Sequence, residues 1–189
     1  MNSDSRILSA RLDGVVWLRI RGKGSFKNSP DLKKFVDSCL ADGESTFVID
    51  LEDCTAMDST FMGTITGVAI DLINRGNQEA SVHVINASPR NTQLLQNLGL
   101  DQVLELDTEG TRWTAQREII SAIFAPRPDG VVESPEAAEV APSDLDETDR
   151  ARHVLKAHEA LASAHAENAP RFRDVVDYFR KDLEKRTSH

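Results

Sequence analysis

The alternation of apolar and polar positions predicts strands and helices in turn over residues 1–125. Short apolar runs predict strands, and apolar residues spaced three and four apart predict the helices between them. The expected strands are 7–12, 15–20, 46–51, 81–85 and 103–106, and the expected helices follow Ser29, Ser59 and Ser88 and begin near Trp113. This order predicts an α/β fold in which crossover helices pack on a small sheet.

The first two strands flank Asp13–Gly14, which is a strong two-residue hairpin signal. An antiparallel hairpin makes the predicted sheet mixed. The run 46–51 is almost continuously apolar, as expected for a strand covered on both faces. Between the hairpin and the first helix, Gly22, Gly24 and Ser25 are expected to form a loop.

The stretch from Val48 to Gly63 contains the only arrangement that suggests chemistry. A polar connector, Leu51–Ala56, is expected to follow the strand. Asp58 then stands where a helix N-cap is expected, and the helix is predicted to run from Ser59 to about Asn74. A helix N-terminus carries about half a positive charge and unpaired N–H groups, so it suits a phosphate.

Composition changes abruptly after Ala125. The stretch Pro126–Asp149 holds four prolines, eight acids and one arginine, a net charge of 1 − 8 = −7. It is expected to be a disordered or loosely attached linker. We therefore divide the chain into a domain at 1–125, a linker at 126–149 and an amphipathic helical extension at 150–189.

The extension is expected to form a helical hairpin with a break at Asn168–Pro170. Forty residues are too few to bury a core alone, so its apolar stripe must dock on something. Three alternatives are open. The hairpin covers the domain's own partner surface, associates with a second chain, or extends the core.

Charge and cysteine content exclude several function classes. The net charge of −9 argues against non-specific nucleic-acid binding and against docking on anionic membrane. The cysteines, Cys39 and Cys54, form no C-x-x-C motif or disulfide framework. No apolar run approaches the length of a membrane span and residues 1–9 do not read as a leader, so we expect a cytoplasmic protein without membrane insertion.

An enzyme is not expected. A catalytic serine at Ser59 needs a general base, and within the α/β part the single histidine is His83, in a predicted strand. The segment Gly22–Ser25 lacks the leading glycine and spacing of a phosphate-binding loop. No cofactor is therefore expected. Metal ligation is not expected either, since spacings of five and seven do not align His153, His158 and His165 on one helix face, where solvated or helix-packing roles are favoured.

In order along the chain, the motifs around Ser59 resemble those of the STAS family, the sulphate-transporter and anti-sigma-factor-antagonist domains. The resemblance covers roughly Ile7–Phe124 and implies a STAS-like mixed sheet with crossover helices. The motifs that carry it are Val48–Leu51, Asp58-Ser59-Thr60-Phe61-Met62-Gly63, Arg75-Gly76, Val82–Asn86, Ser88-Pro89, Leu94–Leu100 and Val103–Leu106.

The resemblance implies a role as an anti-sigma-factor antagonist with Ser59 as phosphoacceptor and Thr60 as second choice. Its implied partners are an anti-sigma serine kinase and a metal-dependent serine phosphatase. A phosphate on Ser59 would add about −1.5 to −2 charge among Asp58, Glu52 and Asp53 and release the partner.

One residue departs from the family pattern. Phe61 stands where most switching members have glycine, and its ring is expected on the partner-facing surface or in the way of a kinase. The expected partner interface comprises Ser59, Thr60, Phe61 and Met62. The alternative function is a non-switching scaffold subunit of a stress-signalling complex or of a lipid or anion transport complex.

Overall fold

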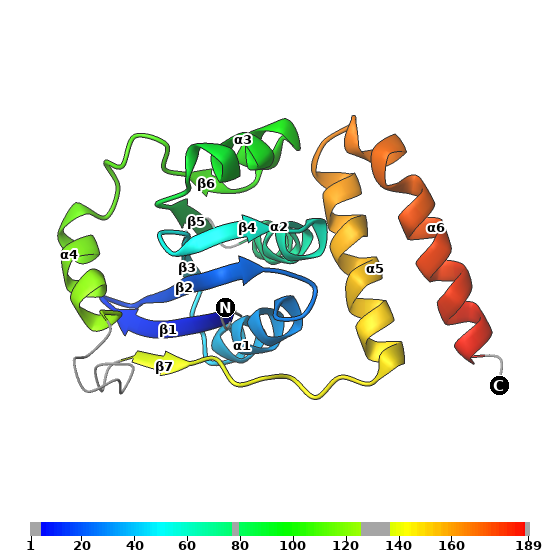
Figure 1. Ribbon diagram of the computed structural model, residues 1–189, viewed down its shortest axis with the longest axis horizontal. Helices are drawn as coiled ribbons and strands as arrows, with labels where there is room; N and C mark the ends of the chain where they lie inside the picture. The colour runs from blue at the N-terminus through cyan, green and yellow to red at the C-terminus, as the bar shows by residue number, and fades with distance from the viewer. Residues whose placement is uncertain (1–4, 77–79, 126–136, 188–189) are drawn as a thin grey trace.

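The computed structural model describes residues 5–76, 80–125 and 137–187. Within them a seven-stranded mixed sheet runs in the order β6-β5-β3-β2-β1-β7, with β4 beside β2 (Figure 1). The strands are β1 (Arg6–Leu12), β2 (Val15–Gly24), β3 (Thr46–Asp50), β4 (Cys54–Met57), β5 (Ser81–Ile85), β6 (Glu105–Leu106) and β7 (Ala137–Glu139).

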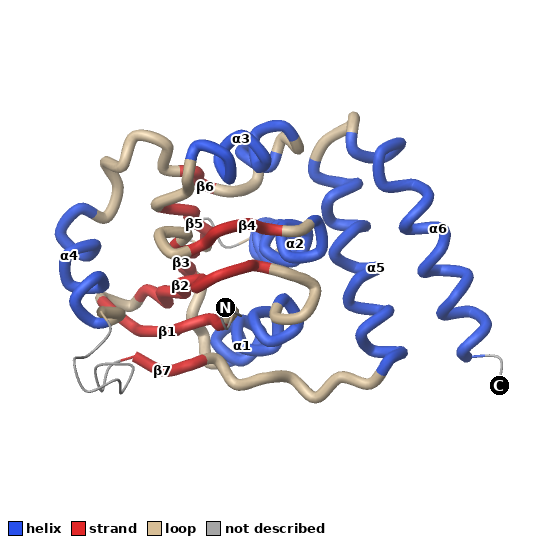
Figure 2. Tube along the Cα trace, in the orientation of Figure 1, coloured by secondary structure: helices blue, strands red, loops and turns tan. Residues whose placement is uncertain are grey.

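Helices cover both faces of this sheet, and a helical hairpin lies beyond one of them (Figure 2). They are α1 (Ser29–Ala41), α2 (Ser59–Asn74), α3 (Pro89–Asn97), the short 3-10 helix η1 (Leu100–Gln102), α4 (Thr114–Ile123), α5 (Glu147–Ala164) and α6 (Asn168–Thr187). The predicted α/β class with a mixed sheet, crossover helices and a C-terminal helical hairpin is confirmed.

The sheet is mixed for the reason the sequence suggested. β1 and β2 pair antiparallel through Asp13 and Gly14, whose φ angles of 54° and 75° suit a tight hairpin turn. β2, β3, β5 and β6 are parallel neighbours, joined by crossover helices. β3 is buried along almost its whole length, as its continuous apolar run predicted.

Two apolar cores flank the sheet. On one face, α1 and α2 pack over Leu18, Ile20, Phe47 and Ile49. On the other face, α4 packs its buried Ile120 and Phe124 against the sheet, in a cluster that also contains Leu8, Trp17, Val48 and Ile85. The start of α2 is therefore held against the sheet by an apolar core.

Two predicted loops are strands. β2 continues through Gly22 to Gly24, and the expected polar connector contains β4, which pairs parallel with that end of β2. Sequence pattern missed β4 because its four residues alternate without a clear apolar run, and its stability comes from the partner strand.

The expected linker is also more structured than predicted. Its first part, 126–136, lies outside the described residues, but Ala137–Glu139 forms β7 against β1 and Val140 is buried. Ser143 donates backbone and hydroxyl hydrogen bonds to Asp31 at 2.7 and 2.6 Å. α5 then begins at Glu147 with Asp146 as its N-cap, ahead of the predicted boundary at 150. Backbone pairing with β1 holds this acidic segment in spite of its composition.

No helix in the described part of the chain is long and apolar enough to cross a membrane.

Candidate functional site

Asp58 shapes the chain where β4 meets α2. Its Oδ1 accepts the backbone N–H of Phe61 at 2.9 Å, so it is the N-cap of α2. Its Oδ2 accepts the N–H of Phe26 at 2.8 Å, and its own N–H donates to Gly24 O at 3.0 Å. Ser59 is thus placed as the first residue of α2, where the helix dipole favours an anion.

Ser59 is partly exposed at this helix start, whereas the three residues that follow it are buried. Thr60 and Met62 are each 5% exposed. Among the residues expected to meet a partner, Ser59 is therefore the one that is not buried.

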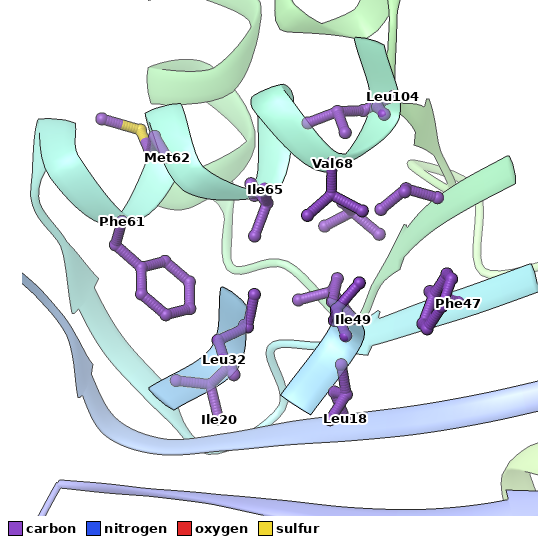
Figure 3. Close-up of a cluster of buried hydrophobic side chains, with 14 of the residues drawn as sticks. Leu18, Ile20, Leu32, Phe47, Ile49, Phe61, Met62, Ile65, Val68 and Leu104 are labelled. Atoms are coloured by element: carbon purple, nitrogen blue, oxygen red, sulfur yellow. The ribbon is translucent and has the colours of Figure 1, made fainter. Parts of the chain in front are cut away.

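Phe61 does not lie on the partner-facing surface, which corrects the sequence-based expectation. Its ring is fully buried and points into the core toward Leu32 and Ile20 (Figure 3). A Cβ atom at Gly24 would stand 2.7 Å from this ring, so the glycine leaves the space that the phenylalanine fills. The residue that departs from the family pattern is therefore a core residue.

The expected carboxylate cluster around Ser59 does not form either. Glu52 pairs with Arg19 at 2.6 Å and Asp53 with Arg21 at 3.3 Å. The four residues of β4 lie between Asp53 and Asp58, and five steps at a rise of about 3.3 Å per residue span about 16 Å. Of the three acids, Asp58 is the one that adjoins Ser59.

A histidine of the C-terminal extension completes the site. Nε2 of His158, on α5, lies 3.0 Å from Oγ of Ser59. Nδ1 of the same ring lies 2.8 Å from the carbonyl oxygen of Val154, which can only accept. Nδ1 therefore carries a proton, and Nε2 is the ring nitrogen that shares a hydrogen bond with the Ser59 hydroxyl.

A second histidine of α5 binds hydroxyls next to this pair. Nε2 of His153 lies 2.9 Å from Oγ of Ser29 and 3.2 Å from Oγ1 of Thr64. Burial, together with the smaller effects of the nearby charges of Lys33 and Arg150, lowers the pKa of His153 to about 4. The ring is consequently neutral at pH 7.

Sequence reasoning missed His158 because it looked for a partner of Ser59 inside the α/β part. His83, the histidine it considered there, lies 2.9 Å from the hydroxyl of Ser81 and stacks edge-on against Trp113. Burial lowers the pKa of His83, and the charge of Arg112 lowers it further. The sequence signal for His158 was its place beside Ala157 and Leu161 on the apolar face of a helix.

Comparison with known proteins places the fold. The model of the STAS domain family matches residues 6–113. The chain belongs to the STAS family. No curated protein sequence matches it.

Solved structures resemble this STAS domain at low identity. The solution structure of a Thermotoga maritima protein, described as a candidate anti-sigma factor antagonist, is 21% identical with a TM-score of 0.50, covering 59% of this chain and 86% of its own. An anti-sigma factor antagonist of Mycobacterium paratuberculosis is 19% identical with a TM-score of 0.49, covering 64% and 97%. The unphosphorylated SpoIIAA of Bacillus is 16% identical with a TM-score of 0.46, covering 61% and 94%.

The α5–α6 hairpin lies beyond the matched residues and packs on the STAS domain. α5 runs beside α2, and α6 lies on the outer side of α5 (Figure 1). The close approach depends on Gly63, where a Cβ atom would overlap the carbonyl oxygen of Ala157. Asn168, at the hairpin bend, donates to the carbonyl oxygens of Leu98 and Leu161 at 2.8 and 3.0 Å.

Among the residues that the structure describes, no group of three or more histidines, cysteines and acids lies close enough to hold a metal ion. The chemistry available at the start of α2 is that of one hydroxyl, one capping carboxylate and one imidazole.

Proposed function

We propose that this STAS protein is a cytoplasmic regulatory binding module of the anti-sigma-factor-antagonist type, whose partner switching is controlled by phosphorylation of Ser59. Its partners would be an anti-sigma serine kinase and a metal-dependent serine phosphatase, acting on transcription. The observation that carries the proposal is the placement of the Ser59 hydroxyl at the capped N-terminus of α2.

This placement suits a reversible phosphate. The dipole of α2 stabilises negative charge at its first turn, so the domain itself tolerates the modification. The added charge of about −1.5 to −2 next to Asp58 would repel acidic groups of a partner, and binding would require the phosphate to be desolvated at the interface. Binding changes without refolding of the domain.

The position of His158 on α5 argues against catalysis by the Ser59–His158 pair. His158 belongs to the helix that covers Ser59, so a substrate that reached Ser59 would have to displace the general base. We therefore propose a protein that other enzymes act upon.

Pull-downs of native partners with the full chain as bait test the switch. The unmodified chain and Ser59→Ala should recover the kinase, whereas Ser59→Asp should lose it. Intact-mass analysis of the native protein should show one phosphate, absent from Ser59→Ala. Equal recovery from all baits, with no phosphate on the native protein, would contradict the switch.

That contrary result would favour a second function, a non-switching scaffold subunit of a stress-signalling or transport complex. The hydrogen bond that engages the Ser59 hydroxyl within the chain is the observation in its favour.

A further inference from the structure

The α5–α6 hairpin occupies the face of the STAS domain that carries Ser59. His158 contacts Ser59 and His153 contacts Thr64, both on α2, while His153 also reaches Ser29 on α1. A protein that docks on the start of α2 would need the surface that α5 covers in the structure (Figure 1).

The hairpin holds this surface with few large, fully buried side chains. Many of its large apolar side chains, including Val154, Leu155, Phe172 and Phe179, are only partly buried. A cleft of about 470 Å³ remains between α1, α2 and α5, bordered by Lys33, Gly67 and Lys156. The hairpin residues that are buried are mostly small or polar: Ala151, Ala157, His158, Leu161, Asn168 and Val176.

The STAS core beneath the hairpin is assembled mainly from the domain's own residues. The ring of Phe61 packs against Gly24 and lies in one cluster with Ile20, Leu32 and Ile65 (Figure 3). The hairpin adds Leu161 to this cluster, with Ala164 and Phe172 at its border. Most side chains of this cluster therefore belong to the STAS domain and not to the hairpin.

A phosphate on Ser59 competes with the docked position of α5. Oγ of Ser59 lies 3.0 Å from Nε2 of His158, which is hydrogen-bond distance. A phosphate would replace the hydroxyl hydrogen and place three further charged oxygens beside α5. Phosphorylation and docking of α5 therefore oppose one another.

We propose that the α5–α6 hairpin is an intramolecular inhibitor of the STAS domain, which covers Ser59 when docked and must leave before a kinase or partner can bind this face. The inference rests on the proposed function for the role of Ser59 as the modified residue. The docked hairpin lowers the fraction of the unphosphorylated chain that can bind, and a partner of the full chain binds the molecules whose hairpin has been released.

Gly63→Ala in the full chain tests the detachment. The new methyl group would overlap the Ala157 carbonyl, while alanine favours the helix in α2 itself. Gly67→Ala is the matched control on the same helix, because its Cβ would meet Ala160 at an ordinary 3.5 Å. Amide hydrogen exchange should be at least tenfold faster over 147–187 in Gly63→Ala, unchanged in the sheet, and unchanged everywhere in Gly67→Ala.

A second variant tests, without a kinase, whether a phosphate on Ser59 opposes the docking of α5. Phosphoserine incorporated at position 59 during translation should raise exchange over 147–187 at least tenfold relative to the unmodified chain. This result does not depend on whether cells phosphorylate Ser59, so the failure of the proposed function and the failure of this inference are separable.

Two results would overturn the inference. The first is that the hairpin amides exchange equally slowly in Gly63→Ala, in the phosphoserine protein and in the unmodified chain. This would show that α5 neither leaves nor competes with the phosphate. Faster exchange of hairpin and sheet together would show that the hairpin is an integral part of the core.

Discussion

Nε2 of His158 lies 3.0 Å from Oγ of Ser59, although 99 residues separate the two in sequence. The hydrogen bond joins the start of α2, where this STAS protein carries its candidate phosphoacceptor, to the C-terminal extension. The hydroxyl proposed as a signal for other proteins is thereby engaged within the chain itself.

A double-mutant cycle measures this contact. The free energy of hairpin opening, obtained from hydrogen exchange in the unmodified chain, Ser59→Ala, His158→Ala and the double variant, should give a coupling energy of about 1 kcal/mol. The cycle removes the separate contribution of His158 to packing against Phe172, whose ring centre lies 5.7 Å away. Strictly additive effects would show that the hydrogen bond does not stabilise docking.

Acid should weaken the docked hairpin through His153. The pKa of His153 is about 4 in the folded chain and 6.5 ordinarily. As pH falls from 6.5 to 4, His153 therefore takes up a proton in the unfolded chain but not in the folded one. The free energy of unfolding should therefore be highest above pH 6.5 and should fall by at most about 3 kcal/mol as pH falls toward 4.

Urea denaturation between pH 7 and pH 4 checks this, with His153→Gln as the control. Glutamine can still hydrogen-bond Ser29 and Thr64 but does not titrate, so the difference in stability between the two proteins should shrink as pH falls. A difference that stays constant would mean that His153 does not titrate differently in the fold.

Removing the Phe61 ring should destabilise the STAS domain. Phe61→Ala empties a fully buried site and should cost about 3 to 5 kcal/mol in urea denaturation, and Phe61→Leu much less. Gly24→Ala should be costly in the parent chain, where its methyl group meets the ring, and much less costly in Phe61→Ala. Equal costs in both backgrounds would contradict the complementarity of the two residues.

The buried ion pair between Arg19 and Asp50 should matter more than an exposed one. Arg19 donates two hydrogen bonds to Asp50, and the two residues are 5% and 1% exposed. Asp50→Asn leaves the guanidinium with Glu52 as its remaining acidic partner and should cost about 3 kcal/mol of unfolding free energy.

Glu44→Gln is the matched control. It breaks the pair with Arg11, whose side chain is 54% exposed, and should cost about 1 kcal/mol or less. Denaturation curves of the two variants should therefore differ clearly, and equal midpoints would argue that burial does not set the strength of the Arg19–Asp50 pair.

The order of strands and helices was predictable because it rests on local physics. The Asp13–Gly14 turn and the aspartate cap of α2 act over a few residues, and the bounds Ser59–Asn74 agree with the predicted helix. Amphipathic spacing likewise predicted the two C-terminal helices. β4 and β7 were missed because each owes its strand conformation to a neighbour, β2 or β1, that is distant in sequence.

The direction in which Phe61 points was not predictable, and for a related reason. α2 is buried on the side facing the sheet and also on the side facing α5, so its apolar pattern does not distinguish the two faces. What places the ring inside is the space left by Gly24, more than thirty residues away in sequence.

The sequence by itself determined the α/β class, the capped helix start with its serine, and the existence of a C-terminal hairpin that must dock. Only the tertiary structure decided that the hairpin covers Ser59, with His158 on its hydroxyl and Ala157 against Gly63. Docking depends on the shape and hydrogen-bonding groups of two surfaces brought together by the fold, whereas sequence periodicity describes only which face of each helix is apolar.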